Sequence, residues 1–276
     1  MSPTVTVLLD NRSRDPELAS EHGLSLWIEA DGVCLLFDTG QSDAFAGNAR
    51  RLGVPLERAD HIVISHGHYD HAGGLGSALD AAPQAVVHLH PEAMRTRFSI
   101  KDPRRPRSVG IPDSVRNVLE AHASRVRWTH GPTMLTPHLG LSGPIPRRTD
   151  FEDVGGPFFR DAEGRSPDDL VDDQALWIDG PSGLVAVLGC GHAGVVNTLL
   201  HVEQRTKTRR LNAVLGGLHL VAASERRLSI TIDALRERRP SLLAPAHCTG
   251  ETAMERLREA FPQAWRPVFS GARFDL

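Results

Sequence analysis

The chain has 276 residues, of which 40% are hydrophobic and 24% are charged, and this is enough to bury the core of one domain. Its formal net charge of −3 offers no basic surface for nucleic acid, and no apolar run approaches the roughly 20 residues of a membrane span. The three cysteines, Cys34, Cys190 and Cys248, are too few and too far apart in sequence for a disulfide framework. We therefore expect a cytoplasmic protein that acts on small molecules, without a nucleic-acid or membrane partner. No feature of the sequence indicates its oligomeric state.

The first half of the chain alternates strand and helix patterns. Short apolar runs between turn residues predict strands, and amphipathic runs behind a capping residue predict helices. The Asp31-Gly32 pair predicts a hairpin turn. The expected strands are residues 4–9, 24–30, 33–37, 61–64 and 85–89, and the expected helices are residues 42–52, capped by Ser42, 75–81 and 114–123.

The second half repeats this theme. A hairpin is expected around the turn at residues 179–183. The expected strands are residues 175–178, 184–188, 212–215 and 241–244, and the expected helices are residues 195–204, 224–238 and 251–260. Two sets of strands with flanking helices predict an α/β (α+β) fold, a four-layer αββα sandwich that forms a single domain over residues 1–276.

Two stretches interrupt the alternation. Residues 101–107 (KDPRRPR) combine four basic residues with two prolines, which predicts an exposed loop; it is either simply solvated or a basic lid that meets an anionic substrate. Residues 142–173 are rich in glycine, proline and acids, and loops of that length are usually functional lids or disordered segments. We expect this insertion to cover the substrate, with Arg147 as a phosphate or carboxylate contact.

The stretch at residues 65–71 (SHGHYDH) places three imidazoles and a carboxylate directly after an apolar strand. In such a turn His66 and His68 can project from one side of the loop to hold one ion, while Asp70 and His71 reach a second position. Neutral imidazole with carboxylate suits Zn first, with Mn or Fe as alternatives. A surface loop that happens to be rich in histidine is the competing interpretation.

This motif, preceded by LLFDTG at residues 35–40, resembles the metallo-β-lactamase superfamily. The resemblance implies an αββα sandwich with one or two divalent metal ions at one edge, and it extends over residues 5–250. Four further strings are similar to the branch named after dihydropterin-ribofuranosylaminobenzene-phosphate synthase: EHGLSL at 21–26, GCGHAG at 189–194, GGLHL at 216–220 and AHCTG at 246–250.

The remaining metal ligands must come from distant segments. His192 and His247 each follow an apolar strand, and the resemblance implies that both are ligands. Many dinuclear members carry a bridging Asp after the strand that corresponds to residues 185–188, where this chain offers Cys190 or His192. A thiolate could bridge, because metal coordination deprotonates a thiol, so the ligand set and the number of ions stay open. Asp38 resembles the buried carboxylate that orients metal-binding histidines.

Three residues are candidates for a role in catalysis or in substrate binding. Asp70 and His219 are the candidate catalytic residues, and His219 could donate a proton or contact the substrate. His22 is a further candidate substrate contact. A purely structural role is an equal alternative for His22 and His219.

The chemistry follows from the charge of the site. A bound cation lowers the pKa of water from 15.7 toward roughly 7 and polarises the bond that is attacked. The sequence therefore predicts a metal-dependent hydrolase that uses metal-bound hydroxide on a small anionic ester, a phosphoester ahead of a lactone. One alternative is a pterin-related synthase or transferase with the metal as Lewis acid, which the aromatic content of only 5% argues against. Another is a non-catalytic metal-binding protein with a closed ligand shell.

Overall fold

The computed structural model describes residues 2–276, and seven of its strands form the first main sheet. The sheet is antiparallel from β16 to β3 and parallel from β3 to β8, so β4 and β5 end at the same edge. Its strands, in spatial order, are β16 (Arg273–Asp275), β1 (Thr4–Leu9), β2 (Ser25–Ala30), β3 (Val33–Phe37), β4 (His61–Val63), β5 (Val86–Leu89) and β8 (Val126–Trp128).

The second main sheet has six strands and includes the predicted hairpin, whose two strands pair antiparallel. The next two strands run parallel to the hairpin's second strand, which again brings several carboxyl ends to one edge. Its strands, in spatial order, are β15 (Leu242–Ala246), β14 (Leu211–Gly217), β13 (Gly183–Leu188), β12 (Ala175–Gly180), β10 (Leu139–Leu141) and β9 (Thr133–Thr136).

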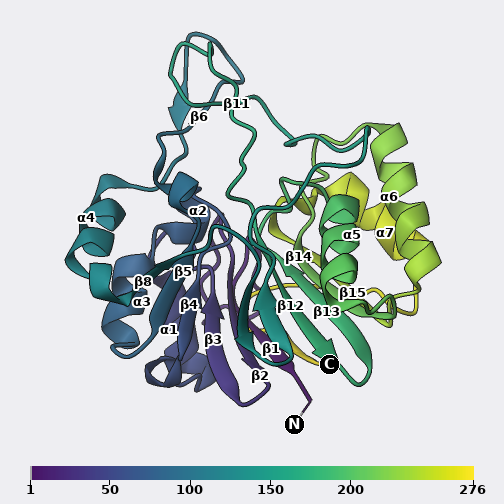
Figure 1. Ribbon diagram of the computed structural model, residues 1–276, viewed down its shortest axis with the longest axis horizontal. Coiled ribbons are helices and arrows are strands. Elements are labelled where there is room, and N and C mark those ends of the chain that lie inside the picture. The colour runs from purple at the N-terminus through teal and green to yellow at the C-terminus, as the bar shows by residue number, and fades with distance from the viewer. Residues whose placement is uncertain (1) are drawn as a thin grey trace.

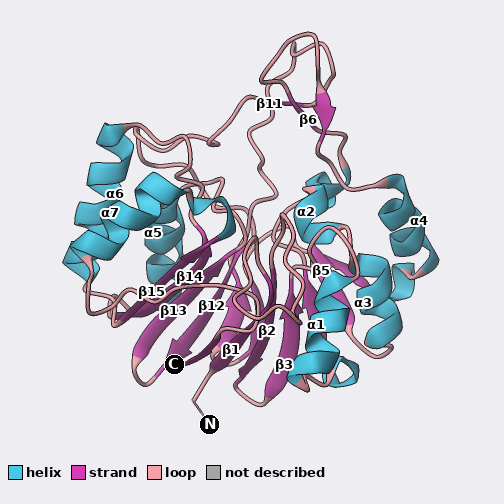
Figure 2. Cartoon of the chain, turned by 180° about the vertical axis from the view of Figure 1, so that it is seen from behind, coloured by secondary structure: helices cyan, strands magenta, loops and turns pink. Residues whose placement is uncertain are grey.

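Helices cover the outer face of each sheet (Figures 1 and 2). On the first sheet lie α1 (Ala44–Leu52), α2 (Tyr69–Ala72), α3 (Leu75–Ala81) and α4 (Asp113–Ala121), and on the second lie α5 (Val195–Thr206), α6 (Glu225–Arg238) and α7 (Glu251–Ala260). Short 3-10 turns occupy Leu56–Arg58, Pro91–Met94, Ala123–Arg125 and His247–Thr249. No helix among residues 2–276 has the length and apolar character that a membrane crossing needs.

Three apolar clusters hold these layers together. One joins the inner faces of the two sheets, where Phe37 of β3 and Val187 of β13 are both fully buried. The other two pack helices against the outer faces, for example Phe45 of α1 and Leu199 of α5. Burial on both faces explains why these strands are almost continuously apolar. The predicted four-layer αββα sandwich is therefore confirmed.

The starts of α6 and α1 differ in their capping, and a cap was predicted only for α1. Ser224 caps α6, because its side chain accepts a hydrogen bond from the Arg227 amide at 3.1 Å. Ser42 does not occupy the capping position of α1, which begins two residues later at Ala44 with Asp43 before it. The Ser42 hydroxyl still bonds at the start of this helix, because it accepts from the Ala44 amide at 3.2 Å while it donates to Glu21 Oε2 at 2.7 Å.

The two interrupting stretches meet in a small sheet that projects beyond the main sheets (Figure 1). Its strands β11 (Phe158–Phe159), β6 (Phe98–Ser99) and β7 (Arg107–Ser108) are antiparallel, with Ser99 opposite both Phe158 and Arg107. We call residues 98–108 with 157–159 the flap. Residues 101–106 are its largely exposed turn, as expected for a charged, proline-containing segment. The predicted 142–173 insertion thus contributes one flap strand.

Buried ion pairs tie the flap to the body. The Arg97 side chain is 1% exposed, and it donates to Asp168 Oδ2 and to Asp172 Oδ2 at 2.8 Å each. Asp172 Oδ2 also accepts from the Gly67 amide at 2.7 Å, inside the histidine-rich motif. A hydrogen-bonded arrangement of this kind fixes the base of the flap relative to the motif.

Candidate metal centre

The histidine-rich motif occupies the turn that follows β4, at the carboxyl end of a buried strand, and the beginning of α2. A Cβ atom at Gly67 would lie 2.1 Å from the Ala93 carbonyl oxygen, so only glycine fits at this point of the turn. The tight turn brings His66 Nε2 to 3.0 Å from His68 Nδ1.

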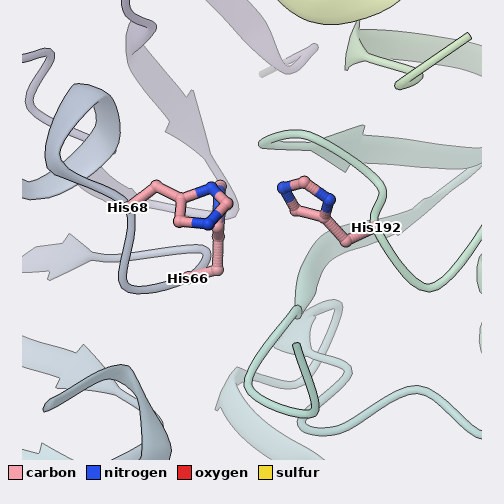
Figure 3. Close-up of side chains that lie close together, drawn as sticks. All are labelled: His66, His68 and His192. Atoms are coloured by element: carbon pink, nitrogen blue, oxygen red, sulfur yellow. The ribbon is translucent and has the colours of Figure 1, made fainter. Parts of the chain in front are cut away.

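His66, His68 and His192 form the first cluster, in which the candidate ligand atoms all lie within 4.8 Å of one another. Figure 3 shows His192 approaching from the side of the second sheet, opposite the other two. His192 Nδ1 lies 2.8 Å from the Val154 carbonyl oxygen, so it carries the proton and leaves Nε2 with a free lone pair. Neither His68 Nε2 nor His192 Nε2 has a hydrogen-bond partner among residues 2–276, although both are buried.

A second cluster combines Asp70, His71 and His247. His247 Nε2 lies 3.2 Å from His71 Nε2 and 3.3 Å from Asp70 Oδ2, whereas His71 Nε2 and Asp70 Oδ2 are 3.8 Å apart. His22 joins this cluster, with its Nε2 at 3.1 Å from Asp70 Oδ2. The sequence suggested His22 only as a substrate contact, but its position beside Asp70 and His247 also suits a ligand.

Cys190 lies between the two clusters. Its Sγ is 3.1 Å from His71 Nε2, and it shares possible ligand groups with His66 and His71, with His192 and His219, and with His247 and Cys248. The turn that carries it needs glycine, because a Cβ atom at Gly189 would lie 2.0 Å from Ser65 Oγ. The structure therefore brings the predicted alternative ligand Cys190 to the position from which both clusters can be reached.

Cys248 is a candidate ligand that sequence reasoning missed. It belongs to the group with Cys190 and His247, and it lines the same cavity as both. Its position directly after His247 was the available signal. The sequence pattern indicated Cys190 as a possible bridging ligand but Cys248 only as a possible disulfide partner, because no spacing rule joins two cysteines so far apart in sequence.

Asp38 has the position of an orienting carboxylate. Its Oδ2 lies 2.7 Å from His71 Nδ1 and 2.8 Å from Ser65 Oγ, and its Oδ1 accepts from the Ser65 amide at 2.7 Å. Burial alone would lower the pKa of His71, but the Asp38 charge and hydrogen bond outweigh burial and raise this pKa to about 9. Asp38 therefore fixes the ring of His71, with Nε2 pointing at Cys190 and His247.

The protonation of the first cluster suits a metal ion. Burial, together with mutual repulsion, lowers the pKa of His66 and His192 well below the usual 6.5. Burial also lowers the pKa of His68 well below 6.5, against the opposing effect of Asp70. Neutral imidazoles with free lone pairs, a carboxylate and a thiol are the donor set of a zinc-type site. Buried nitrogens normally have a partner, and a bound ion is one kind of partner that His68 and His192 could have. These residues therefore fit a divalent metal.

The two remaining predicted residues are His219, which lies beside the first cluster, and Arg147, which does not face the cavity. The His219 ring lies 4.2 Å from that of His192, its Nε2 is 3.2 Å from the Gly155 carbonyl oxygen, and its Nδ1 has no partner among the described residues. Arg147 donates instead to the carbonyl oxygens of His192, at 2.8 Å, and Asp169, at 2.6 Å. Arg147 does not line the cavity that lies beside these clusters. Its hydrogen bonds stabilise the turn that carries His192, and it is not placed beside a substrate.

A cavity of about 690 Å³ lies above the clusters and below the flap. This is a usual size for a small-molecule site. Its floor is formed by His22, His68, Asp70, Cys190, His219, His247 and Cys248. Phe158 of the flap lies directly above, with its ring centroid 5.0 Å from that of His68. The arrangement thus joins candidate metal ligands to a space that a small molecule can enter.

Sequence comparisons identify relatives over almost the whole chain. A family model described as the metallo-beta-lactamase superfamily matches residues 21–247, a span that includes every predicted site residue. An uncharacterized protein of Methanocaldococcus jannaschii is 29% identical and covers 92% of this chain and 94% of its own length. A protein of the same organism named 7,8-dihydropterin-6-methyl-4-(beta-D-ribofuranosyl)-aminobenzene-5'-phosphate synthase is 28% identical, over 91% of this chain and 89% of that protein.

Solved structures show the same fold. A crystal structure described as a metal-dependent hydrolase of the beta-lactamase superfamily has a TM-score of 0.83 at 30% identity, with 99% of both chains covered. A diphosphatase from the PhnP family has a TM-score of 0.58 at 14% identity, with 99% of this chain and 97% of that chain covered. At that identity the second likeness concerns the fold alone.

Proposed function

The chain belongs to the metallo-β-lactamase superfamily, and we propose that it is a metal-dependent hydrolase of a small anionic ester, a phosphoester ahead of a lactone. One observation carries the proposal: the buried, unpartnered nitrogens of His68 and His192 lie in a cluster of possible ligands, and that cluster adjoins a cavity of about 690 Å³. A closed structural metal site would have no such space. The solved metal-dependent hydrolase with 30% identity supports the same activity class.

In this proposal His66, His68 and His192 would hold one ion, and Asp70, His71 and His247 would hold a second. Zinc is the first candidate, because imidazole, carboxylate and thiolate all suit it. When bound, divalent ions lower the pKa of water and polarise the ester bond that the water attacks.

The chain's own residues supply proton handling and orientation. Asp70 faces the cavity, and His22 holds its Oδ2 at 3.1 Å, so Asp70 is placed to accept a proton from attacking water. His219 also lines the cavity; its Nε2 donates to the Gly155 carbonyl oxygen, so its unpartnered Nδ1 would donate a proton to the leaving oxygen from the imidazolium form. Phe158 covers His68 and His192 and keeps bulk water away from them.

We further propose that Cys190 is a ligand shared by the two positions, because its Sγ is 3.1 Å from His71 Nε2 and belongs to groups with ligands of both clusters. Cobalt-substituted protein is expected to show a near-ultraviolet sulfur-to-cobalt charge-transfer band that weakens strongly in Cys190→Ser. Cys34→Ser is the matched control, because Cys34 is also buried but outside both clusters. A band that is unchanged in Cys190→Ser and lost in Cys248→Ser would assign the thiolate ligand to Cys248 instead.

A synthase that uses the metal as Lewis acid is the second candidate, and the relative named as a dihydropterin-related synthase favours it. A pterin needs flat aromatic surfaces for stacking, whereas the cavity is lined by one phenylalanine, Phe158, and one tyrosine, Tyr69, beside its histidines. We therefore rank hydrolysis first.

Metal removal tests the proposal directly. We expect EDTA treatment to abolish turnover of bis(4-nitrophenyl) phosphate, and one or two equivalents of zinc per chain to restore it, because the ions activate the attacking water. A lactone assayed in parallel ranks the two ester classes. Tight metal binding without turnover of either ester would favour the synthase, and turnover that survives complete metal removal would refute the metal-dependent mechanism.

A further inference from the structure

We propose that the flap binds a phosphate group of the substrate at a subsite remote from the bond that reacts. This inference rests on the proposed function and specifies the substrate as an elongated ester with a terminal phosphoryl dianion. The binding group is the basic edge of the flap, defined as Lys101, Arg105 and Arg107, and all three residues line the cavity.

The basic edge carries unpaired positive charge. None of its three side chains forms an ion pair with any residue in the described range 2–276. Asp102 is the one carboxylate of this turn that lines the cavity, so the four charged flap residues there sum to 3 − 1 = +2. Asp102 is already engaged by Arg104, whose Nε lies 3.4 Å from Asp102 Oδ1 and which does not line the cavity. Three cations without an ion pair, of which only Arg107 has another contact within residues 2–276, with Tyr69, match the charge of a phosphate dianion.

The pairing of the strands gives the distance from the metal centre. Gly110 pairs with His68 in an antiparallel bridge, and Arg107 lies three residues further along the same segment, roughly 10 Å away at the rise of an extended chain. Ser99 is opposite Arg107, and Lys101 follows two residues later, roughly 7 Å further out. At these backbone separations Lys101 lies well beyond the floor, so we infer that the anion recognised here differs from the group that reacts.

The cavity also has apolar lining. Val109, Pro157, Phe158 and Val221 belong to it, which favours a substrate with an aromatic or aliphatic body besides its charged groups. Arg107 lies at the inner end of the basic edge, because its Nη2 donates to the hydroxyl of Tyr69, the residue before Asp70, at 2.6 Å.

The turn that carries the basic edge is preorganised. Pro103 and Pro106 restrict the backbone, and the amide of Arg105 donates to the Asp102 carbonyl oxygen at 2.9 Å. Below it, the buried Arg97 anchors the flap through Asp168 and Asp172. Less ordering of the loop is then needed when the anion binds.

Two phosphodiesters that differ only at the remote end test this subsite. One is 4-nitrophenyl phenyl phosphate, and the other carries a phosphonobutyl chain at the para position of the phenyl ring. We expect the ratio of their kcat/KM values to favour the phosphonate, and to fall about tenfold in Lys101→Ala/Arg105→Ala through KM, because two charged contacts are lost. Arg165→Ala removes the charge of an exposed side chain that does not line the cavity and does not engage Asp102, and it should leave the ratio unchanged.

Calorimetry separates failure of the subsite from failure of the proposed function. Titration of zinc-loaded protein with 4-phenylbutylphosphonate should give a dissociation constant that rises about tenfold in the double variant and less at high salt. If neither ester is hydrolysed but this loss of binding occurs, the proposed function fails and the subsite stands. If the double variant binds the phosphonate as tightly as the wild type, the anion is held at the metal centre and the subsite is refuted.

Discussion

Alanine in place of His192 is expected to remove at least one equivalent of bound zinc and to lower kcat/KM for a phosphodiester by at least about a hundredfold. His192 is the only member of the first cluster that comes from the second sheet, so His66 and His68 alone would leave an open, two-nitrogen site. Its Nδ1 is fixed by the Val154 carbonyl oxygen, so Nε2 is the atom left to bind the ion, and alanine removes it. The measurements are metal content by plasma mass spectrometry and steady-state kinetics on the same samples.

The control for this prediction is His201→Ala. His201 is also a buried histidine, on α5, but its Nε2 lies 3.1 Å from the Ser142 carbonyl oxygen and it belongs to no possible ligand group in the described chain. Its replacement should affect stability without changing the zinc content. Full zinc occupancy in His192→Ala would contradict the ligand role of His192 and leave Cys190 as the connection between the sheets.

The fold was predictable because most of its elements carry local signals. Apolar runs such as that of β13 identify buried strands without knowledge of their partners, and the Asp31-Gly32 turn determines which strands pair. The exceptions are short elements, among them β8, β9, β10 and β16, which have three or four residues each and were not predicted. β6, β7 and β11 have two residues each, and a two-residue strand has no periodicity of its own. The flap forms because distant segments meet, which no local pattern reveals.

The candidate site was predictable to the extent that its residues are close in sequence. His66, His68, Asp70 and His71 share one turn, so their chemistry is visible as a motif. The contribution of Cys248 depends instead on the meeting of two strand ends in space. Arg147 illustrates the opposite error: a basic residue in a lid-like segment suggested an anion contact, but its guanidinium donates to two backbone carbonyl oxygens.

Backbone strain marks the same site. Asp38, His219 and His247 have φ angles of +59°, +44° and +50°, a region that residues other than glycine seldom occupy. Each such residue costs of order 1 kcal/mol or more and persists only where its surroundings impose it. Here the surroundings are ring and carboxylate contacts: His247 Nδ1 lies 2.8 Å from Asn11 Oδ1, and Asp38 is held by Ser65. The strained positions therefore support a functional site at this edge, independently of the motif.

The second large effect concerns Asp38, which we expect to act as a positioning residue. Asp38→Asn keeps the shape of the side chain and tolerates the positive φ, but it removes the charge that favours the present orientation of His71. Zinc affinity should fall about 10- to 100-fold, as for other residues that orient metal-binding histidines. Asp38→Ala should in addition lower the free energy of unfolding by about 2–4 kcal/mol, because a buried Ser65 amide and His71 Nδ1 lose their partner.

Two measurements separate positioning from simple structural support. Chelator competition gives zinc affinity, and urea unfolding of the metal-free protein gives stability. Asp60→Asn is the matched control, because Asp60 Oδ2 also accepts a backbone hydrogen bond, from Cys34 at 2.8 Å, but at the other end of β3. If Asp38→Asn loses stability in the metal-free state yet binds zinc like the wild type, Asp38 only supports the turn. A loss of zinc affinity with little loss of stability requires that the carboxylate act through the His71 ring.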